Sequence, residues 1–295
     1  MKLKKSTLFF YSLAEMPINI ALFPILVFIP KFYTGEMGVP LALAANIILA
    51  VRIFDVFTDP VVGYINDRTN TKWGRRRPWI AIATPLLMVS IYMLFIPPEG
   101  AGALHLFLWM FLLSIGTTML IIPYYAWGAE LSPDYNERSR ITGWRSISGV
   151  VGSLSAQLIP TIALVFFGLG GSTNVLYIVG IASVIIMPIC VFFTVLKVPE
   201  SKDYVQSNIS PIKGFKIMLE NSPFKRLIMA FMFGGIAFSI TIPLYLFFIT
   251  YVLKAEEMAI FMLTFFYLTN IVAVPFWVWL SKQIGKHKAY MCSFA

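Results

Sequence analysis

The sequence predicts an all-α polytopic membrane protein, and three observations lead to that prediction. Hydrophobic residues make up 58% of the 295 residues and charged residues only 13%, whereas a soluble domain carries about 25% charged residues. The apolar stretches are long and continuous, which favours membrane-spanning helices over an open sheet or a barrel. Positive charges gather on one side of the resulting topology. The composition therefore excludes an ordinary cytosolic enzyme, a disordered chain and a secreted disulfide scaffold.

Long apolar runs separated by short polar loops predict eight spans and the start of a ninth near Tyr290. A polar linker follows the sixth span, and six spans before such a linker are the layout of a two-bundle transporter. We therefore expect a six-helix bundle at 1–197, a cytoplasmic linker at 198–225 and an incomplete second bundle at 226–295. The predicted spans cover about residues 7–30, 40–66, 79–96, 104–130, 142–167, 174–197, 226–252 and 257–281.

The positions of the basic residues predict the orientation of these spans. The chain has 23 lysines and arginines, which fall at the N-terminus and after the even-numbered spans, with Lys31, Lys254 and Arg52 as the exceptions. By the positive-inside rule this side faces the cytoplasm, together with the N-terminus. The formal net charge of +9 is then a consequence of topology, so we expect no nucleic-acid partner.

The sequence holds no sign of catalysis or of a resident cofactor. Cys190 and Cys292 lie in apolar stretches and provide neither a disulfide framework nor a metal motif. The sequence has no phosphate-binding loop and no nucleophile elbow, and no cleavable signal peptide is evident. We therefore expect a protein that is not an enzyme and needs no cofactor.

The second predicted span contains three charged residues in the segment RIFDVFTDP. Arg52, Asp55 and Asp59 are three and four residues apart, which places them on one helix face, and each charge in a membrane costs on the order of 3 kcal/mol. Two carboxylates with the nearby hydroxyl of Thr58 can hold a small hard cation or a proton. Arg52 can hold the carboxylates when the cation is absent. The alternative is a structural polar cluster that locks this helix to a neighbour.

The first predicted span contains another polar pair. Glu15 and Asn19 are four residues apart with Pro17 between them, so both fall on one helix face. They can hydrogen-bond a polar substrate. The alternative is that they satisfy backbone groups released by the proline.

Aromatic residues near the end of the fourth span are candidates for a sugar site. Aromatic rings with polar edges can stack on sugar rings, although packing at the membrane interface explains single Tyr or Trp residues equally well. Arg145, at the start of the fifth span, either lines the same cavity or extends to the cytoplasmic surface. The candidate aromatic residues are Tyr124, Tyr125 and Trp127.

The segment GYINDRTNTKWGRRRPW between the second and third spans is a candidate gate. Gly63 permits close helix approach, Asp67 can pair with an arginine, and Gly74 permits a tight turn. Such a cluster can lock the cytoplasmic side until it breaks during alternating access; the alternative is simple anchoring at the membrane surface. The cations of this gate are Arg75, Arg76 and Arg77, and we expect the loop SPDYNERSR to contribute Asp134, Glu137, Arg138 and Arg140. Arg52 in the second span is a further candidate gating residue.

The segment DVFTDPVVGYINDRTNTKWGRRRPW resembles the signature of the glycoside–pentoside–hexuronide:cation symporters of the major facilitator superfamily, a family that includes the melibiose permease. The resemblance covers essentially the whole chain and implies the major facilitator fold, with twelve helices in two bundles. It implies sugar uptake driven by Na⁺ or H⁺, with Arg145 in the sugar site. The cation ligands implied by the resemblance are Asp55, Asp59, Thr58 and Thr118, with Asp55 and Asp59 as metal ligands if the ion is Na⁺.

Departures from the family pattern bear on the ion and the substrate. Thr58 stands where the melibiose permease has an asparagine, which weakens the expectation of Na⁺ and strengthens that of H⁺. Tyr125 stands where that permease has a sugar-stacking tryptophan. Asn19 and Ile121 stand where it has sugar-binding aspartates, so melibiose itself is not the expected substrate.

Together these residues predict a monomeric cation:sugar symporter of the inner membrane that works by alternating access. Its expected partners are a sugar or glycoside, a monovalent cation and the lipid bilayer. One alternative is transport of another amphiphile, such as a lysolipid. Another is a membrane remnant that does not transport, because the apolar stretch at Tyr290 stops at Ala295 and leaves helix carbonyls without partners in lipid. We accordingly expect an incomplete copy of a twelve-helix transporter.

Overall fold

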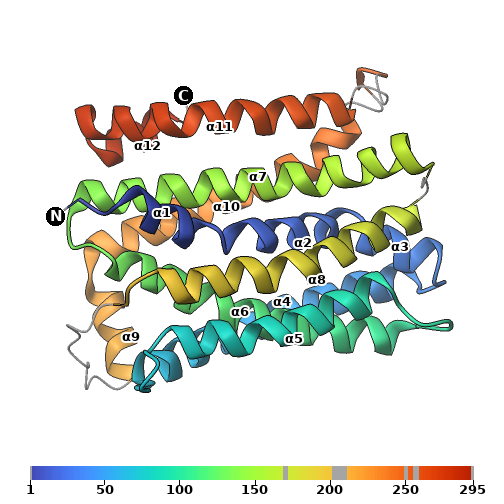
Figure 1. The fold of residues 1–295 in the computed structure, drawn as a ribbon, viewed down its shortest axis with the longest axis horizontal. Coiled ribbons are helices and arrows are strands. Elements are labelled where there is room, and N and C mark those ends of the chain that lie inside the picture. The colour runs from blue at the N-terminus through green and yellow to red at the C-terminus, as the bar shows by residue number, and fades with distance from the viewer. Residues whose placement is uncertain (1, 169–171, 201–210, 249–251, 255–258, 294–295) are drawn as a thin grey trace. The chain divides into compact units, whose positions relative to one another are not determined.

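The computed structural model describes residues 2–168, 172–200, 211–248, 252–254 and 259–293. Within these ranges the chain forms helices and no strands, as the sequence predicts (Figure 1). The chain divides into two compact units, one made of Met1–Asp203 with Tyr267–Ala295 and the other of Tyr204–Phe266.

Among the described residues of the first unit, six helical segments are long and apolar enough to cross a membrane. They correspond to the first six predicted spans, so the chain is a multi-pass membrane protein. The helices that form them are α1 Lys5–Ser12, α2 Glu15–Val27, α4 Leu41–Arg68, α5 Arg77–Phe95, α6 Ala103–Glu130, α7 Tyr135–Phe167 and α8 Ser172–Lys197. A short helix, α3 Ile29–Gly35, lies between α2 and α4.

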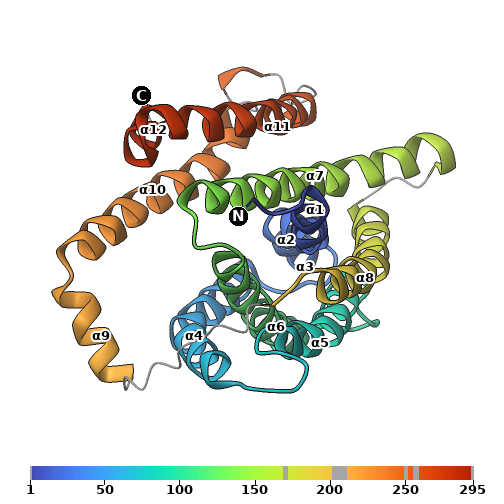
Figure 2. The same ribbon diagram turned by 60° about the vertical axis from the view of Figure 1, so that its left-hand side comes forward.

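The helices of the first unit contact one another in an order that differs from their order in the sequence. α4 packs on α6, α6 on α5, α5 on α8, α8 on α2, and α2 on α7, as Figure 2 shows from one end of the bundle. This order brings α2, α6 and α7, which lie far apart in the sequence, close enough to share a polar cluster. It also leaves α4 at the edge of the series, with α6 and α3 as its main neighbours.

The first predicted span is broken into α1, α2 and α3 rather than continuous. Pro17 explains the break after Ser12, because a proline cannot donate to the carbonyl four residues earlier and its ring clashes with that carbonyl. Pro30 lies in the first turn of α3, where a missing N–H is tolerated. The prediction of one helix at 7–30 is therefore wrong in detail.

The fifth span begins at Tyr135, which is earlier than predicted, so much of SPDYNERSR is helix rather than loop. One carboxylate oxygen of Asp134 accepts the N–H groups of Asn136 and Glu137, both at 2.8 Å, as expected for an acidic residue at a helix N-terminus. The N–H of Glu137 lowers the pKa of Asp134 below its usual value. Arg140 pairs with Glu137 at 2.7 Å, one turn further along.

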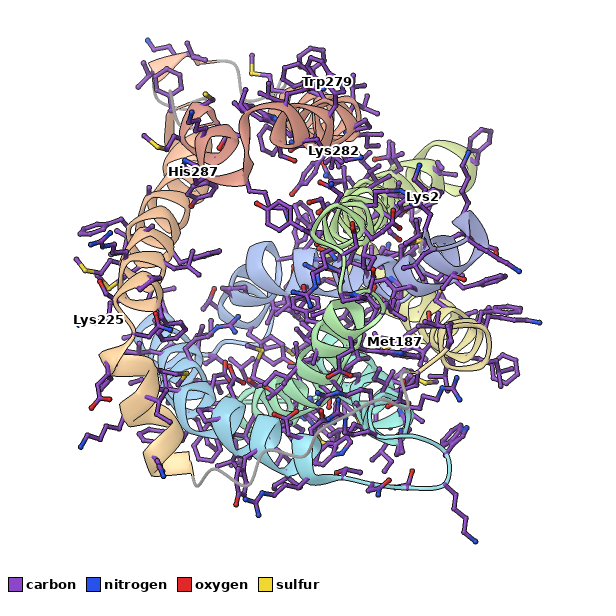
Figure 3. All side chains as sticks on the ribbon, turned by 90° about the vertical axis from the view of Figure 1, so that its left-hand side faces the viewer. Lys2, Met187, Lys225, Trp279, Lys282 and His287 are labelled. Carbon is purple, nitrogen blue, oxygen red and sulfur yellow. The ribbon has the colours of Figure 1, made fainter. Side chains whose placement is uncertain are left out.

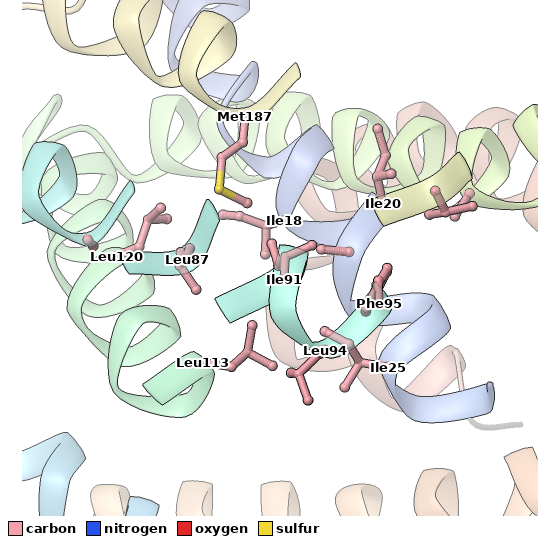
Figure 4. Close-up of a cluster of buried hydrophobic side chains, with 14 of the residues drawn as sticks. Ile18, Ile20, Ile25, Leu87, Ile91, Leu94, Phe95, Leu113, Leu120 and Met187 are labelled. Atoms are coloured by element: carbon pink, nitrogen blue, oxygen red, sulfur yellow. The ribbon is translucent and has the colours of Figure 1, made fainter. Parts of the chain in front are cut away.

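The core of the bundle is a cluster of buried hydrophobic side chains from α2, α5, α6 and α8 (Figure 4). Close helix contact depends on a small residue where α7 crosses α2, because a Cβ atom at Gly152 would collide with the carbonyl oxygen of Met16. Small residues at such crossings are typical of membrane helices. The labelled members of the cluster are Ile18, Ile20, Ile25, Leu87, Ile91, Leu94, Phe95, Leu113, Leu120 and Met187.

The second unit contains α9 Pro211–Glu220, followed by α10 Ser222–Phe247. The predicted linker at 198–225 therefore holds a helix that the sequence analysis did not foresee, while residues 201–210 lie outside the described part of the chain. The seventh predicted span corresponds to α10, and the eighth to α11 Ala259–Ile284. The predicted ninth stretch overlaps α12 Lys286–Cys292, and its last residues, 294–295, lie outside the described residues.

Candidate functional site

Two carboxylates on α4 accept hydrogen bonds from two hydroxyls on α6. The Ser114 hydroxyl donates to Oδ1 of Asp55, and the Thr118 hydroxyl donates to Oδ1 of Asp59 at 2.7 Å. The two carboxylates are four residues apart on α4, and the two hydroxyls are four residues apart on α6. The two hydrogen bonds therefore lie one helical turn apart. We call these two bonds the α4–α6 rungs. They place four oxygen-bearing side chains together near the middle of a membrane span.

Arg52 and Thr58 lie beside the rungs but make different contacts. Arg52 Nη1 is 3.3 Å from Oδ2 of Asp55, so its positive charge balances the negative charge of that carboxylate. The Thr58 hydroxyl donates back to the carbonyls of its own helix, at 3.3 Å to Phe54 and 3.4 Å to Asp55. Its placement as a cation ligand, which the family resemblance implies, would need the side chain to rotate.

The polar face of α4 is open in the described part of the chain. The side chain of Arg52 is 57% exposed and that of Asp55 18%, and Asp59 is also exposed. A charge near the bilayer centre costs about 3 kcal/mol or more, so charged residues in spans face the bundle interior or water. We therefore expect this face of α4 to lie toward the bundle interior or water rather than toward lipid.

A second polar cluster joins α2, α6 and α7. The Tyr125 hydroxyl donates to Oε1 of Glu15 at 3.1 Å, and the guanidinium carbon of Arg145 lies 3.8 Å from the centre of the Tyr125 ring. Arg145 Nε is 4.0 Å from Oε2 of Glu15, and this buried oxygen has no hydrogen-bond partner among the described residues. The cluster therefore leaves a buried acceptor next to a cation, in reach of an added polar group.

The remaining predicted substrate residues are placed differently from one another. The Asn19 side-chain amide donates to the carbonyl of Glu15 at 2.9 Å, so Asn19 lies at the edge of this cluster. Tyr124 is fully buried, and its hydroxyl donates to the carbonyl of Tyr11 at 2.8 Å. Trp127 is also fully buried, and its indole N–H donates to the carbonyl of Pro199 at 3.0 Å. Both aromatic side chains thus use their polar atoms to hold helices together.

Acidic residues at the ends of α4 and α6 bind the arginines of the loop between α4 and α5. Arg76 is buried and pairs with Asp67 at 2.8 Å and with Glu130, at the end of α6, at 2.7 Å; it also donates to Asn66. Arg75 reaches the same Glu130 oxygen at 2.6 Å. Burial alone would lower the pKa of Arg76, but hydrogen bonds to Glu130 and Asp67 raise it above its usual value.

Glu200, just beyond α8, completes this arrangement. Its Oε1 accepts the backbone N–H groups of Arg75 and Arg76, each at 2.7 Å, and Arg77 donates to the neighbouring Val198 carbonyl at 2.8 Å. Gly74 has a φ of +123°, and a Cβ atom there would collide with the Glu200 carboxylate. The structure therefore supports the expected need for glycine at 74. We call Gly74–Arg77 with Glu130 and Glu200 the α4–α5 clasp.

Two expectations about this region differ from the structure. A Cβ atom at Gly63 would lie 3.8 Å from Ile122, an ordinary contact, so Gly63 is not required for close helix approach here. Arg138 and Glu137 of SPDYNERSR contact their own segment and the N-terminus. Arg138 donates to the Ser132 carbonyl at 3.0 Å, and Glu137 accepts the N–H of Leu3 at 3.2 Å.

Sequence reasoning missed three residues of these sites: Ser114, Glu130 and Glu200. A signal for Ser114 was present, since it precedes Thr118 by four residues and so matches the spacing of the α4 carboxylates. Glu130 and Glu200 are among only 14 acidic residues, and both stand at the ends of spans on the side that carries the arginines.

Charged side chains that face water inside a helical membrane bundle are typical of transport proteins. The family described as MFS/sugar transport protein matches residues 10–295, and this chain belongs to that family. The match confirms the family resemblance, and it places the chain among transporters rather than enzymes.

Individual relatives differ in what their names say they carry. The isoprimeverose transporter of Lactiplantibacillus pentosus is 28% identical, over 96% of this chain and 60% of the relative. Sodium-dependent lysophosphatidylcholine symporter 1 of Mus musculus is 26% identical, over 89% and 56%. Inner membrane symporter YicJ of Escherichia coli (strain K12) is 22% identical, over 89% and 58%. The chain thus spans between 56% and 60% of the length of these relatives.

Proposed function

We propose that this protein is a secondary active transporter that couples the movement of a cation to the uptake of a sugar or glycoside. The observation that carries the proposal is the pair of α4–α6 rungs, which hold two carboxylates inside a span of a sugar-transport family member. Relatives named as symporters support the coupling, and one named for isoprimeverose supports the substrate class.

The coupling ion in this proposal, Na⁺ or H⁺, binds between α4 and α6. Asp55 and Asp59 supply the charge, and Thr118 and Ser114 supply hydroxyl oxygens. Without the ion, each hydroxyl donates its proton to a carboxylate; with the ion, the hydroxyl lone pairs turn toward it. Thr58 joins the site only after rotation. The same side chains thus serve both states, and Arg52 balances Asp55 in the empty one.

The substrate in this proposal binds at the second polar cluster. Oε2 of Glu15 accepts no hydrogen bond from the described residues. A substrate hydroxyl that donates to it would also lie near the guanidinium of Arg145. The ring of Tyr125 offers a stacking face, although Arg145 covers one side of it. Asn19 lies near enough to add a further hydrogen bond, whereas Tyr124 and Trp127 support the walls of the site.

Alternating access in this proposal requires the α4–α5 clasp to open and close. The clasp ties the α4–α5 loop to the ends of α6 and α8, so its release frees that end of the bundle. We further propose that the protein acts as a monomer in the inner membrane, with its N-terminus in the cytoplasm, in accordance with its basic residues.

A second candidate substrate is a lysolipid, because one relative is named a sodium-dependent lysophosphatidylcholine symporter. A zwitterionic headgroup could use Arg145 and Glu15 as partners of opposite charge. A third candidate function is a membrane protein that does not transport.

Uptake into vesicles that contain the protein separates these candidates. We expect a sugar or glycoside to accumulate against its gradient when an inward Na⁺ or H⁺ gradient is imposed. Accumulation of lysophosphatidylcholine alone would favour the second candidate. Absence of any accumulation over a broad panel of sugars, glycosides and lysolipids would contradict the transporter proposal.

The hydroxyls of α6 are expected to matter more for ion binding than Thr58. Ser114→Ala and Thr118→Ala each remove an oxygen from the rungs, so the ion concentration for half-maximal uptake should rise in both. Thr58→Val should change it less, because that hydroxyl bonds its own helix. Ser155→Ala on α7 is the matched control, since this hydroxyl also bonds only its own helix. A larger effect of Thr58→Val than of Ser114→Ala would contradict this order.

A further inference from the structure

We propose that α9 lies in the plane of the membrane surface and binds anionic phospholipid headgroups. Its sequence, PIKGFKIMLE, has ten residues, which span about 15 Å and cannot cross a hydrocarbon core of about 30 Å. By the helical period, positions 212, 215, 218 and 219 share one face, whereas Lys213, Lys216 and Glu220 share the opposite face. The helix is therefore amphipathic.

Apolar side chains of α9 are exposed in its own unit. Ile217, Met218 and Leu219 are 46%, 42% and 52% exposed, on a helix whose lysines are also exposed. By the helical period, Met218 and Leu219 lie on the apolar face, whereas Ile217 lies beside Lys213. Two adjacent apolar side chains exposed on one face are unfavourable in water, so a partner with an apolar interior and a polar surface would cover them. A bilayer surface has this character.

A rigid elbow at Asn221 holds α9 beside the membrane. The N–H of Asn221 donates to the carbonyls of Ile217 and Met218, at 3.1 and 3.2 Å, and closes the end of α9. Its side-chain oxygen accepts the N–H of Phe224 at 3.1 Å and so caps the start of α10. Because only Asn221 separates α9 from α10, which corresponds to the seventh predicted span, the end of α9 stays at the bilayer surface.

The charge around this elbow selects an anionic surface. Lys213, Lys216, Lys225 and Arg226 are exposed, and Glu220 is the one acidic residue between positions 211 and 226. Figure 3 shows Lys225 on the first turn of α10. Basic clusters directly next to a span bind anionic lipids on the cytoplasmic side, the side that the basic residues predict for this segment. The inference does not depend on the ion or the substrate.

Spin labels on the two faces of α9 test the proposal in the reconstituted protein. Met218→Cys and Glu220→Cys, each with Cys190→Ala and Cys292→Ser, are labelled in vesicles of phosphatidylcholine with phosphatidylglycerol. We expect the label at 218 to collide with dissolved oxygen and the label at 220 with a water-soluble nickel chelate. Equal access of the chelate to both positions would overturn the proposal. Shielding of position 218 from both reagents would also overturn it, in favour of a protein partner.

Lipid composition tests the role of charge. The oxygen access at position 218 should fall when phosphatidylglycerol is omitted, and the variant Lys213→Gln/Lys216→Gln should lose this difference. Lys282→Gln/Lys288→Gln, which removes the same charge elsewhere, should retain it. The proposal fails if the α9 variant keeps the full difference or if the control loses as much.

Discussion

Replacing Asp59 with asparagine is expected to abolish accumulation of substrate against its gradient and to leave exchange across the membrane intact. Asparagine keeps an oxygen that can accept the Thr118 hydroxyl, so the contact between α4 and α6 survives. It cannot take up a proton or carry the charge that attracts a cation. Gradient-driven uptake and substrate counterflow in the same vesicles measure the two activities separately.

The matched control for this variant is Glu99→Gln, which removes a carboxylate from an exposed position between α5 and α6. It should keep both activities. If Asp59→Asn accumulates substrate as well as the unmodified protein does, the α4 carboxylates do not bind the coupling ion. Asp55→Asn should resemble Asp59→Asn, because the two carboxylates occupy equivalent positions on successive turns.

Replacing Glu200 with alanine is expected to destabilise the α4–α5 clasp. The change leaves the N–H groups of Arg75 and Arg76 without their acceptor, and an unpaired buried donor costs about 1–3 kcal/mol. Gly74→Ala should act in the same direction, because its Cβ atom would displace the Glu200 carboxylate and its positive φ is strained. Thermal unfolding in detergent measures the loss of stability.

Reagents should reach buried positions near the clasp more easily in the variants that lose stability. A cysteine-directed reagent on the cytoplasmic side should label Ser132→Cys, a buried position near the clasp, faster in both variants. Glu99→Ala serves as control and should change neither quantity. Unaltered melting temperature and labelling rate in both clasp variants would show that Glu200 does not hold this loop closed.

The sequence predicted the helices well because lipid demands long apolar runs. The second and fourth spans agree with α4 and α6 to within about two residues, which is the usual uncertainty of helix ends. The errors arose where side chains, not hydropathy, decide the backbone. Asp134 starts α7 early by capping it, and Pro17 interrupts the first span. α9 escaped notice because a short amphipathic helix has no apolar run.

The candidate ion site was predictable on one helix but not on its partner. Asp55 and Asp59 stand out because charges in a span are rare, and their spacing alone places them together. Ser114 does not stand out, because serine is common in spans and only helix packing shows which carboxylate it meets. The same limit applies to Glu200, whose partners lie more than 120 positions away in the sequence.

The separation of the two α4–α6 rungs has a consequence for the number of ions moved in each cycle. A proton neutralises a single carboxylate, so each rung can carry its own proton. A sodium ion needs several oxygens at once, so both rungs would serve one ion. We therefore expect two protons, or one sodium ion, to move with each substrate molecule. The ratio of substrate concentrations at which net flux reverses, under a known ion gradient, measures this number. For the same ion gradient, the largest inside-to-outside substrate ratio that two ions per cycle can support is the square of the ratio that one ion can support.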